Sequence, residues 1–357
     1  MMPLSLFSGG LRGWLGYVGV VILFLVLVNL LVRRLGGWRR LYRRTKNELT
    51  RTARAFADPV AARIRYRRRL RYLTGVLRDE RAWNDAERAI GYAAGVSARS
   101  APYAVVLGKD RIGVLVAGDV PEQGLPGPWS RDSDDARLWW IPRADLDEYT
   151  AVAAHQPAQA PLLVCLGTDS TGRTAVLLDL LAGPATLSVY GPPRTARAVV
   201  QALAAQLDVR LPAGAVEVAD GIHRSYAGMS LAEAVNRRGV WFVVGAEQPR
   251  TALPAGIRLL SLGVARGSSR LVEALPDGTL RLYGAADWLR VDPLPLAKAV
   301  ARSVRSIPAH DFDGRAPQGP TAGNDDLDDL DLQVGTTGVS AVTAGDAGTD
   351  RKASSWT

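Results

Sequence analysis

The chain has 357 residues, 47% of them hydrophobic, and a formal net charge of +9 at pH 7. This length fits a membrane anchor, one large or two modest domains and a tail, while a single long apolar run excludes a multi-pass transporter. The lone cysteine, Cys165, excludes a disulfide framework and a cysteine-based metal centre, and three scattered histidines argue against a zinc site. We therefore expect no metal and no cofactor.

Residues 14–32 form the long apolar run, with Asn29 as its one polar side chain. In a helix these residues span about 28 Å, close to the hydrocarbon thickness of a bilayer. A cleaved signal peptide would have a charged leading region and small residues at a cleavage site, but only Arg12 precedes the run and no Ala-x-Ala pattern follows. The pattern predicts a retained transmembrane helix after a short extracytoplasmic segment, 1–13. Asn29 either bonds to a partner helix or lies close enough to the interface to be tolerated.

Basic residues are concentrated directly after the apolar run. Between positions 33 and 71, fifteen Lys or Arg accompany two acidic residues, so this segment carries +13 and the rest of the chain is mildly acidic. The positive-inside rule places this flank and everything after it in the cytoplasm, with the N-terminus outside. The abundance of Arg, Ala and Gly is typical of a GC-rich bacterial genome, so we expect a single-pass protein of a bacterial inner membrane.

The basic juxtamembrane region, residues 33–100, is predicted to be helical. Asp58 and Pro59 are typical of a helix start, with Asp as the N-cap and Pro at the first helical position. A second helix is predicted over Trp83–Ala94. An apolar stripe at helical spacing follows Pro59, and it packs either on the body or on a second copy of the chain. The stripe consists of Tyr66, Leu70, Leu73 and Leu77.

Arginines of this region are expected to contact anionic lipid headgroups, where each basic residue contributes about 1 kcal/mol. The alternative is nucleic-acid binding through phosphate contacts, but no recognition motif accompanies the charges, and nucleic acid is not the expected partner. The expected lipid-headgroup contacts are Arg33, Arg34, Arg39, Arg40, Arg43, Arg44, Arg67 and Arg68.

The cytoplasmic body, residues 101–310, begins with short apolar runs separated by turn residues, which predict three hairpins. The hairpins pair Tyr103–Leu107 with Ile112–Ala117, Leu162–Leu166 with Thr174–Leu180, and Leu271–Leu275 with Leu280–Tyr283. A further short strand is predicted over Leu138–Ile141.

Strands alternate with helices in the second part of the body. Thr186–Tyr190 leads into a helix with Val199, Leu203 and Leu207 on its apolar face, and Ser230 with Glu233 forms a capping box. Further strands are predicted over Ala215–Ala219, Val240–Val244 and Ile257–Leu262, the last two suited to buried parallel positions, and a last helix over Pro293–Ser303. The predicted fold class is α/β, with hairpins added to a partly parallel mixed sheet.

The turn after Thr186–Tyr190 occupies the position of a phosphate-binding loop. A Walker motif needs glycines at both ends, a Lys for the phosphates and a Ser or Thr for Mg²⁺. Aligned on Gly191, the chain has Ala196, Arg197 and Ala198 at the last three of these positions, so the magnesium ligand is missing. Two interpretations remain open: an ordinary strand–helix unit, or a degenerate, non-hydrolysing phosphate loop. The residues of such a loop would be Gly191, Arg194, Thr195 and Arg197. No other catalytic motif is present, so no catalytic residue is expected.

Several motifs of the body occur in a characteristic order. They are PGPW at 126–129, LWWIPRADL at 138–146, PLLVCLGTDSTGR at 161–173 and LLDL at 177–180. Over residues 101–244 the chain resembles the uncharacterised cytoplasmic α/β region of actinobacterial membrane proteins that often carry LysM or bacterial transcriptional activation domains. Neither module is recognisable here, so peptidoglycan binding and transcriptional control are not carried over. The resemblance implies an actinobacterial origin and a scaffold-like body.

The tail, residues 311–357, is rich in Gly, Thr, Asp and Ser and is expected to be disordered. Its acidic stretch at 325–331 either keeps the chain soluble, binds a partner, or folds back onto the basic region. The sequence as a whole predicts a single-pass membrane-anchored scaffold or regulatory interaction protein with a non-catalytic body. Its partners would be anionic lipids, a protein that the sequence does not identify, and a second copy of the chain. The alternative is a nucleotide-binding membrane protein related to P-loop ATPases of a secretion or DNA-handling machine.

Overall fold

The computed structural model describes residues 18–27, 29–30, 38–97, 99–121, 124–148, 160–223, 225–226, 228–246, 252–265, 267–283 and 289–310. For residues 38–57 it describes the backbone alone. The predicted extracytoplasmic segment 1–13 and the predicted tail 311–357 lie outside the described residues. The chain forms two units that divide after Arg65, and residues from Tyr66 onward form the larger one.

The larger unit contains a sheet that joins thirteen strands. The strands are β1 Ser100–Leu107, β2 Arg111–Gly118, β3 Ser130–Arg131, β4 Leu138–Pro142, β5 Leu163–Asp169, β6 Ala175–Asp179, β7 Thr186–Tyr190, β8 Val216–Val218, β9 Phe242–Gly245, β10 Arg258–Leu262, β11 Arg270–Ala274, β12 Leu280–Leu282 and β13 Arg290–Asp292. The helices are α2 Trp38–Arg78, α3 Glu80–Val96, α4 Asp145–Glu148, α5 Pro193–Arg210, α6 Leu231–Ala234, α7 Leu296–Ser303 and the 3₁₀ turn η1 Val304–Ser306.

The strand order is β3-β4-β2-β1-β6-β5-β13-β12-β11-β7-β10-β9-β8. The three predicted hairpins are confirmed, because β1 with β2, β5 with β6, and β11 with β12 pair antiparallel. The expected parallel part is confirmed too: β8, β9, β10, β7 and β11 pair in parallel along one side of the sheet. The α/β class with a mixed sheet is therefore correct.

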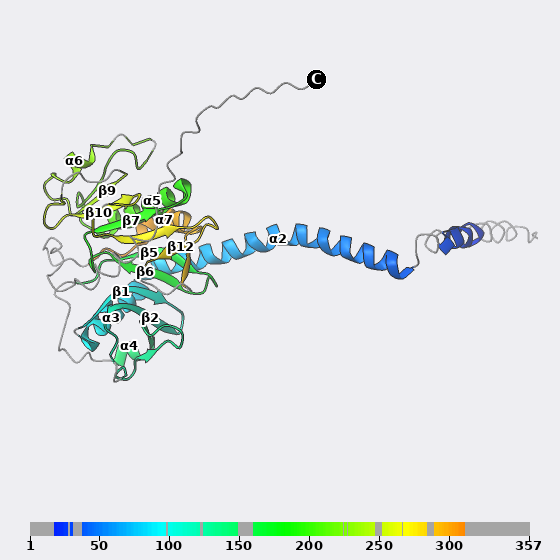
Figure 1. The fold of residues 1–357 in the computed structure, drawn as a ribbon, viewed down its shortest axis with the longest axis horizontal. Helices are drawn as coiled ribbons and strands as arrows, with labels where there is room; N and C mark the ends of the chain where they lie inside the picture. Colours follow the sequence, from blue (N-terminus) through cyan, green and yellow to red (C-terminus); the bar gives the residue numbers. More distant parts are fainter. Residues whose placement is uncertain are drawn as a thin grey trace, which may run out of the picture. The chain divides into compact units, whose positions relative to one another are not determined.

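The sheet is strongly curved and has two lobes. Figure 1 shows β1, β2, α3 and α4 in one lobe and β9, β10 and α6 in the other, with α5, α7 and β12 between them. The curvature brings the Arg270 guanidinium of β11 to 4.9 Å from the ring centroid of Tyr103 on β1, although four strands separate β11 from β1 in the sheet order. Strand pairing alone would not bring these residues together.

Helix α5 fills the position where β5 lacks a full-length neighbour, because β13 pairs with β5 only at Thr168 and Asp169. The Cys165 N–H donates to the Gln206 side-chain oxygen at 2.8 Å, and the Gln206 amide donates to the Cys165 carbonyl at 3.0 Å. Gln206 is completely buried. One glutamine thus satisfies both backbone groups as a neighbouring strand would, which is needed because buried backbone polar groups must be paired.

The predicted helix start at Asp58-Pro59 is wrong, because α2 runs without interruption from Trp38 to Arg78 with Pro59 inside it. Pro59 has no N–H to donate to the carbonyl four residues earlier, but the surrounding chain is rich in Ala and Arg, which favour helix. The second predicted helix is confirmed as α3, which extends beyond the predicted range to Glu80–Val96. Asp79 caps it, accepting a hydrogen bond from the Arg81 N–H at 3.2 Å.

The apolar stripe at the end of α2 packs on the body, one of the two predicted arrangements. Leu70, Leu73 and Leu77 are buried in one core with side chains of α3, β1, β2 and α7. Next to this stripe, the Arg69 guanidinium donates to the Asp292 carboxylate and to the Ser170 carbonyl. The last turns of α2 are therefore part of the body's fold.

The described part of the apolar run, residues 18–27 and 29–30, is helical. The large apolar side chains of this helix are between 46% and 67% exposed. They are Val20, Val21, Ile22, Leu23, Phe24, Leu25, Val26, Leu27 and Leu30. Within the described residues, no helix combines the length and the apolar character needed to cross a bilayer. The remainder of the predicted span 14–32 lies outside those residues, so the span stays a prediction.

Candidate functional site

Helix α5 begins almost directly after β7, with only Gly191 and Pro192 between them. Pro192 is the N-cap and supplies no side-chain hydrogen bond, while its carbonyl accepts the Ala196 N–H at 3.0 Å. Arg194, Thr195 and Arg197 therefore lie in the first turns of the helix. A two-residue connection is too short to wrap its backbone around phosphates as a Walker loop does.

Gly191 is explained by packing. Its φ is +118°, in the region that favours glycine, and a Cβ at this position would lie 2.1 Å from the Ala274 carbonyl oxygen of β11. Glycine is needed here because β11 passes close to the end of β7.

A hollow of about 930 Å³ opens at the start of α5. Its polar lining consists of Arg194, Thr195, Arg197, Gln201, His223 and Ser225. Gln201 positions the opposite wall by donating from its amide to the Ile222 carbonyl at 2.9 Å. Three of the four predicted phosphate-loop residues thus lie together, while Gly191 is not among the lining residues. Two guanidinium groups beside the first turn of a helix can attract an anion, such as a phosphate group.

The predicted lipid-contact arginines fall into three groups. Arg67 and Arg68 are exposed on α2. Arg39, Arg40, Arg43 and Arg44 lie in the part of α2 whose side chains are not described, and Arg33 and Arg34 lie outside the described residues.

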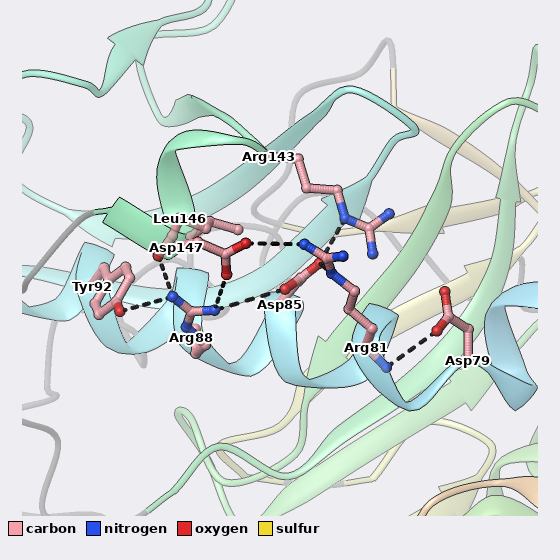
Figure 2. A network of polar contacts seen from close by, with 8 residues as sticks. All are labelled: Asp79, Arg81, Asp85, Arg88, Tyr92, Arg143, Leu146 and Asp147. Carbon is pink, nitrogen blue, oxygen red and sulfur yellow. Dashed lines mark hydrogen bonds and ion pairs between the residues drawn. The ribbon is translucent and has the colours of Figure 1, made fainter.

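A network of ion pairs joins α3 to α4, and sequence analysis missed it (Figure 2). Asp85 is buried, and its carboxylate lies 2.6 Å from the Arg143 Nε. Asp147 accepts from Arg81 at 3.0 Å and from Arg88 at 2.9 Å. The hydrogen bond from Arg88 is the main reason why the pKa of Asp147 is lowered. Every charge in this network has an opposite partner, which is typical of a structural tie.

A second enclosed cluster ties α5 to α3. The Arg210 guanidinium is buried, donates to the Glu87 carboxylate at 2.6 Å, and lies 4.1 Å from the ring centroid of Trp83. Burial lowers the pKa of Arg210, and Glu87 opposes that shift. The Arg210 carbonyl accepts the His310 N–H at 2.9 Å, which fixes the end of the described body.

A third buried cluster ties β10 to the link between β6 and β7. Arg258 donates to the carbonyls of Leu180 and Leu181 at 2.8 Å and to that of Pro184 at 3.2 Å. These residues form the link between β6 and β7. Burial lowers the pKa of Arg258 to about 10, and the charge of Asp179 opposes that shift. Burial raises the pKa of Asp179, which is enclosed by the same segment.

Two tyrosines and a glutamate meet at the ends of β7, β11 and β12. Tyr190 donates to the Tyr283 hydroxyl at 3.0 Å, and Tyr283 donates to the Glu273 carboxylate at 3.0 Å. Burial is the largest cause of the raised pKa of Tyr190, followed by its hydrogen bond with Tyr283. The sequence signal for such polar groups was weak, since single Tyr, Glu and Arg residues stood inside otherwise apolar strands.

Comparison of the chain with models of known protein families, with curated proteins and with solved structures finds no match. The resemblance to actinobacterial membrane proteins therefore stays a prediction.

Proposed function

We propose that the chain is a single-pass protein of a bacterial inner membrane, with the N-terminus outside and a body that acts as a cytoplasmic scaffold or regulatory interaction module. The observation that carries this proposal is the helical segment at residues 18–27 and 29–30, whose described side chains are apolar apart from Asn29 and whose large apolar side chains from Val20 to Leu30 are exposed. A helix that is apolar all round is stable when buried in a protein core or in lipid. The large apolar side chains of this segment are exposed, so lipid is an environment that suits them.

The charged side chains support a body that binds and positions rather than reacts. Asp85, Arg210 and Arg258 are each held by structural partners that join one element to another. Catalytic groups by contrast need a reactive atom accessible from a cleft.

Two experiments test the anchor and its orientation. The full-length chain is expected to stay in the membrane pellet after an alkaline carbonate wash, and protease added outside intact spheroplasts is expected to leave the body uncut. Release of the chain by carbonate would overturn the anchor. Digestion of the body from outside would overturn the orientation and leave the anchor standing.

The hollow at the start of α5 favours a second candidate, a nucleotide-binding membrane protein. The sequence prediction relates it to P-loop ATPases of a secretion or DNA-handling machine, although the connection between β7 and α5 is too short for a Walker loop. Arg194 and Arg197 would hold phosphate oxygens there, and Thr195 would add a hydroxyl. Titration of the purified protein with Mg-ATP and Mg-GTP, followed by its melting temperature, tests this candidate. An unchanged melting temperature removes it, and a rise that disappears in the Arg194→Gln, Arg197→Gln double variant supports it.

A further inference from the structure

Helix α7 carries a row of basic side chains that sequence analysis did not single out. Lys298, Arg302 and Arg305 are spaced i, i+4 and i+7, so they follow one face of α7 into η1, and all three are exposed. The opposite face of α7 is buried in the body through Leu296, Ala299 and Val300. The buried face therefore holds the row in a fixed position on the body.

The end of α2 lies beside α7. The Arg78 guanidinium donates to the Arg302 carbonyl, and the Ser303 hydroxyl donates to the Thr74 carbonyl at 3.4 Å. Arg71 and Arg78 are themselves exposed on α2, so they extend the row of α7 onto the neighbouring helix. We call this surface the α2–α7 basic patch, and it consists of Arg71, Arg78, Lys298, Arg302 and Arg305.

None of the five side chains of the α2–α7 basic patch forms an ion pair with another residue of the described chain. The contrast with Arg69 is direct, since that side chain is on the same helix and is bound by Asp292. Asp79 and Glu80 follow Arg78 in the sequence, and Asp79 is used as the N-cap of α3. The patch therefore presents positive charge that the body does not neutralise.

An apolar residue stands at the head of the row. Leu294 lies in the turn that precedes α7, four residues before Lys298, and is 69% exposed. An exposed leucine beside basic side chains suits a lipid interface, where the apolar group enters the headgroup boundary and the cations meet phosphates. A nucleic-acid backbone would use the cations but would gain little from the leucine.

We infer that the α2–α7 basic patch docks the body against the anionic surface of the membrane. The inference rests on the proposed membrane anchor and goes beyond it, because an anchored body could equally hang free of the bilayer. Its partner is a surface of acidic phospholipid headgroups. The patch holds the body at the membrane through α7, far in sequence from the predicted anchor.

A fluorescent label on α7 tests the inference in the full-length protein. Ala301 is exposed within the row, so Ala301→Cys gives a labelling site next to Lys298 and Arg302. The natural Cys165 is buried and its pKa is raised to about 12, so it does not compete for the label. A matched control, Ser133→Cys, places the label on an exposed loop between β3 and β4. Each labelled protein is reconstituted into nanodiscs that contain lipids with quencher-bearing headgroups, either zwitterionic or mixed with anionic phosphatidylglycerol.

We expect strong quenching at position 301 with anionic lipid, weak quenching with zwitterionic lipid, and no dependence on lipid charge at position 133. Each neutralised cation should reduce the ratio of docked to free body about fivefold, so Lys298→Gln, Arg302→Gln and Arg305→Gln together should abolish the anionic effect. High salt should weaken docking in the same way. Insertion of the protein into the nanodisc tests the anchor, and quenching at position 301 tests docking. Failure of the anchor and failure of docking are therefore distinguished.

Equal quenching at position 301 in both lipids, or quenching that survives the triple variant, would overturn the inference. A different result would be a label at position 301 that is shielded from a soluble quencher in zwitterionic nanodiscs and becomes accessible when residues 311–357 are removed. That result would show that the acidic tail covers the patch, and it would also overturn the inference.

Discussion

Several arginines at the end of α2 and along α7 and η1 are exposed, whereas arginines inside the body are enclosed. Arg71 and Arg305 are exposed and have no carboxylate partner among the described residues, while Arg210 and Arg258 are 2% and 4% exposed and make hydrogen bonds to named acceptors. A buried guanidinium needs these partners because its desolvation is otherwise strongly unfavourable. Arginine therefore has two roles in this chain: the buried arginines connect one element of the body to another, and the exposed arginines present positive charge to solvent.

The largest expected effect comes from removing a buried connector. We expect Arg258→Met to lower the free energy of unfolding by about 3–5 kcal/mol, because the carbonyls of the β6–β7 link lose their donors and Asp179 loses a cationic neighbour. Denaturant unfolding of the full-length protein, followed by tryptophan fluorescence, measures this change.

Arg258→Lys is the control, since it keeps the charge and loses the planar fork, and it should be intermediate. A loss below about 1 kcal/mol for Arg258→Met would contradict the view that buried arginines hold separate elements of the body together.

A smaller loss of stability is expected when the uncharged side chain of Gln206 is removed. This variant measures the contribution of hydrogen bonding without any change of charge. Gln206→Leu leaves the N–H and the carbonyl of Cys165 buried without partners, so we expect a loss of about 2–3 kcal/mol in the same unfolding assay. Gln201→Leu is the matched control on α5: its side chain makes one hydrogen bond at a half-buried position, so the loss should stay below about 1 kcal/mol. Equal losses for the two variants would show that Gln206 does not act as a strand partner.

Local patterns in the sequence were sufficient for most strands and for the ends of several helices. The run Thr186–Tyr190 is a strand as predicted, and the Ser230–Glu233 capping box is present. These features depend on residues near one another in the chain, so alternation and capping chemistry identify them. The two-residue strand β3 and the three-residue strand β13 were missed, because so few residues do not show the alternation that identifies a strand.

The candidate sites were predicted less well, for a related reason. The sequence correctly associated Arg194, Thr195 and Arg197, since the three are close together on one helix. It could not associate Lys298 with Arg71, because more than two hundred residues separate them and only the packing of α7 beside α2 brings their helices together. Nor could it separate Arg69, which is bound to Asp292, from its exposed neighbours Arg67 and Arg68.

The pH dependence of stability tests whether the core around the Cys165 side chain of β5 is dry. Burial raises the pKa of the Cys165 thiol from 9.0 to about 12. The folded state therefore holds this proton more tightly than the unfolded state, and the associated stability is complete below pH 9.0 and is lost as the pH rises towards 12.

Above pH 9.0, we expect the free energy of unfolding of the chain that retains Cys165 to fall by up to about 1.4 kcal/mol per pH unit more than that of Cys165→Ala. Denaturant unfolding of both chains across this range measures the difference in slope, which is independent of the absolute effect of removing the sulfur. Tyr72 titrates in the same range, because burial and then the charge of Cys165 raise its pKa to about 12, so the comparison is made with Tyr72→Phe in both chains. Parallel slopes would indicate that water reaches the thiol in the folded state.

The smallest expected effect on stability belongs to the outward-facing arginines, and it completes the comparison. Arg305→Gln removes a charge that has no partner among the described residues, so the free energy of unfolding should change by no more than about 0.5 kcal/mol. The same substitution should weaken the docking of α7 on anionic nanodiscs, because the cation lost is one that faces the lipid. Arg258→Met is expected to behave in the opposite way, with a large loss of stability and, in the molecules that remain folded, unchanged docking. If Arg305→Gln instead destabilised the fold by more than about 1 kcal/mol, the exposed row on α7 would be a structural feature of the body, and the distinction between connecting and outward-facing arginines would fail at that position.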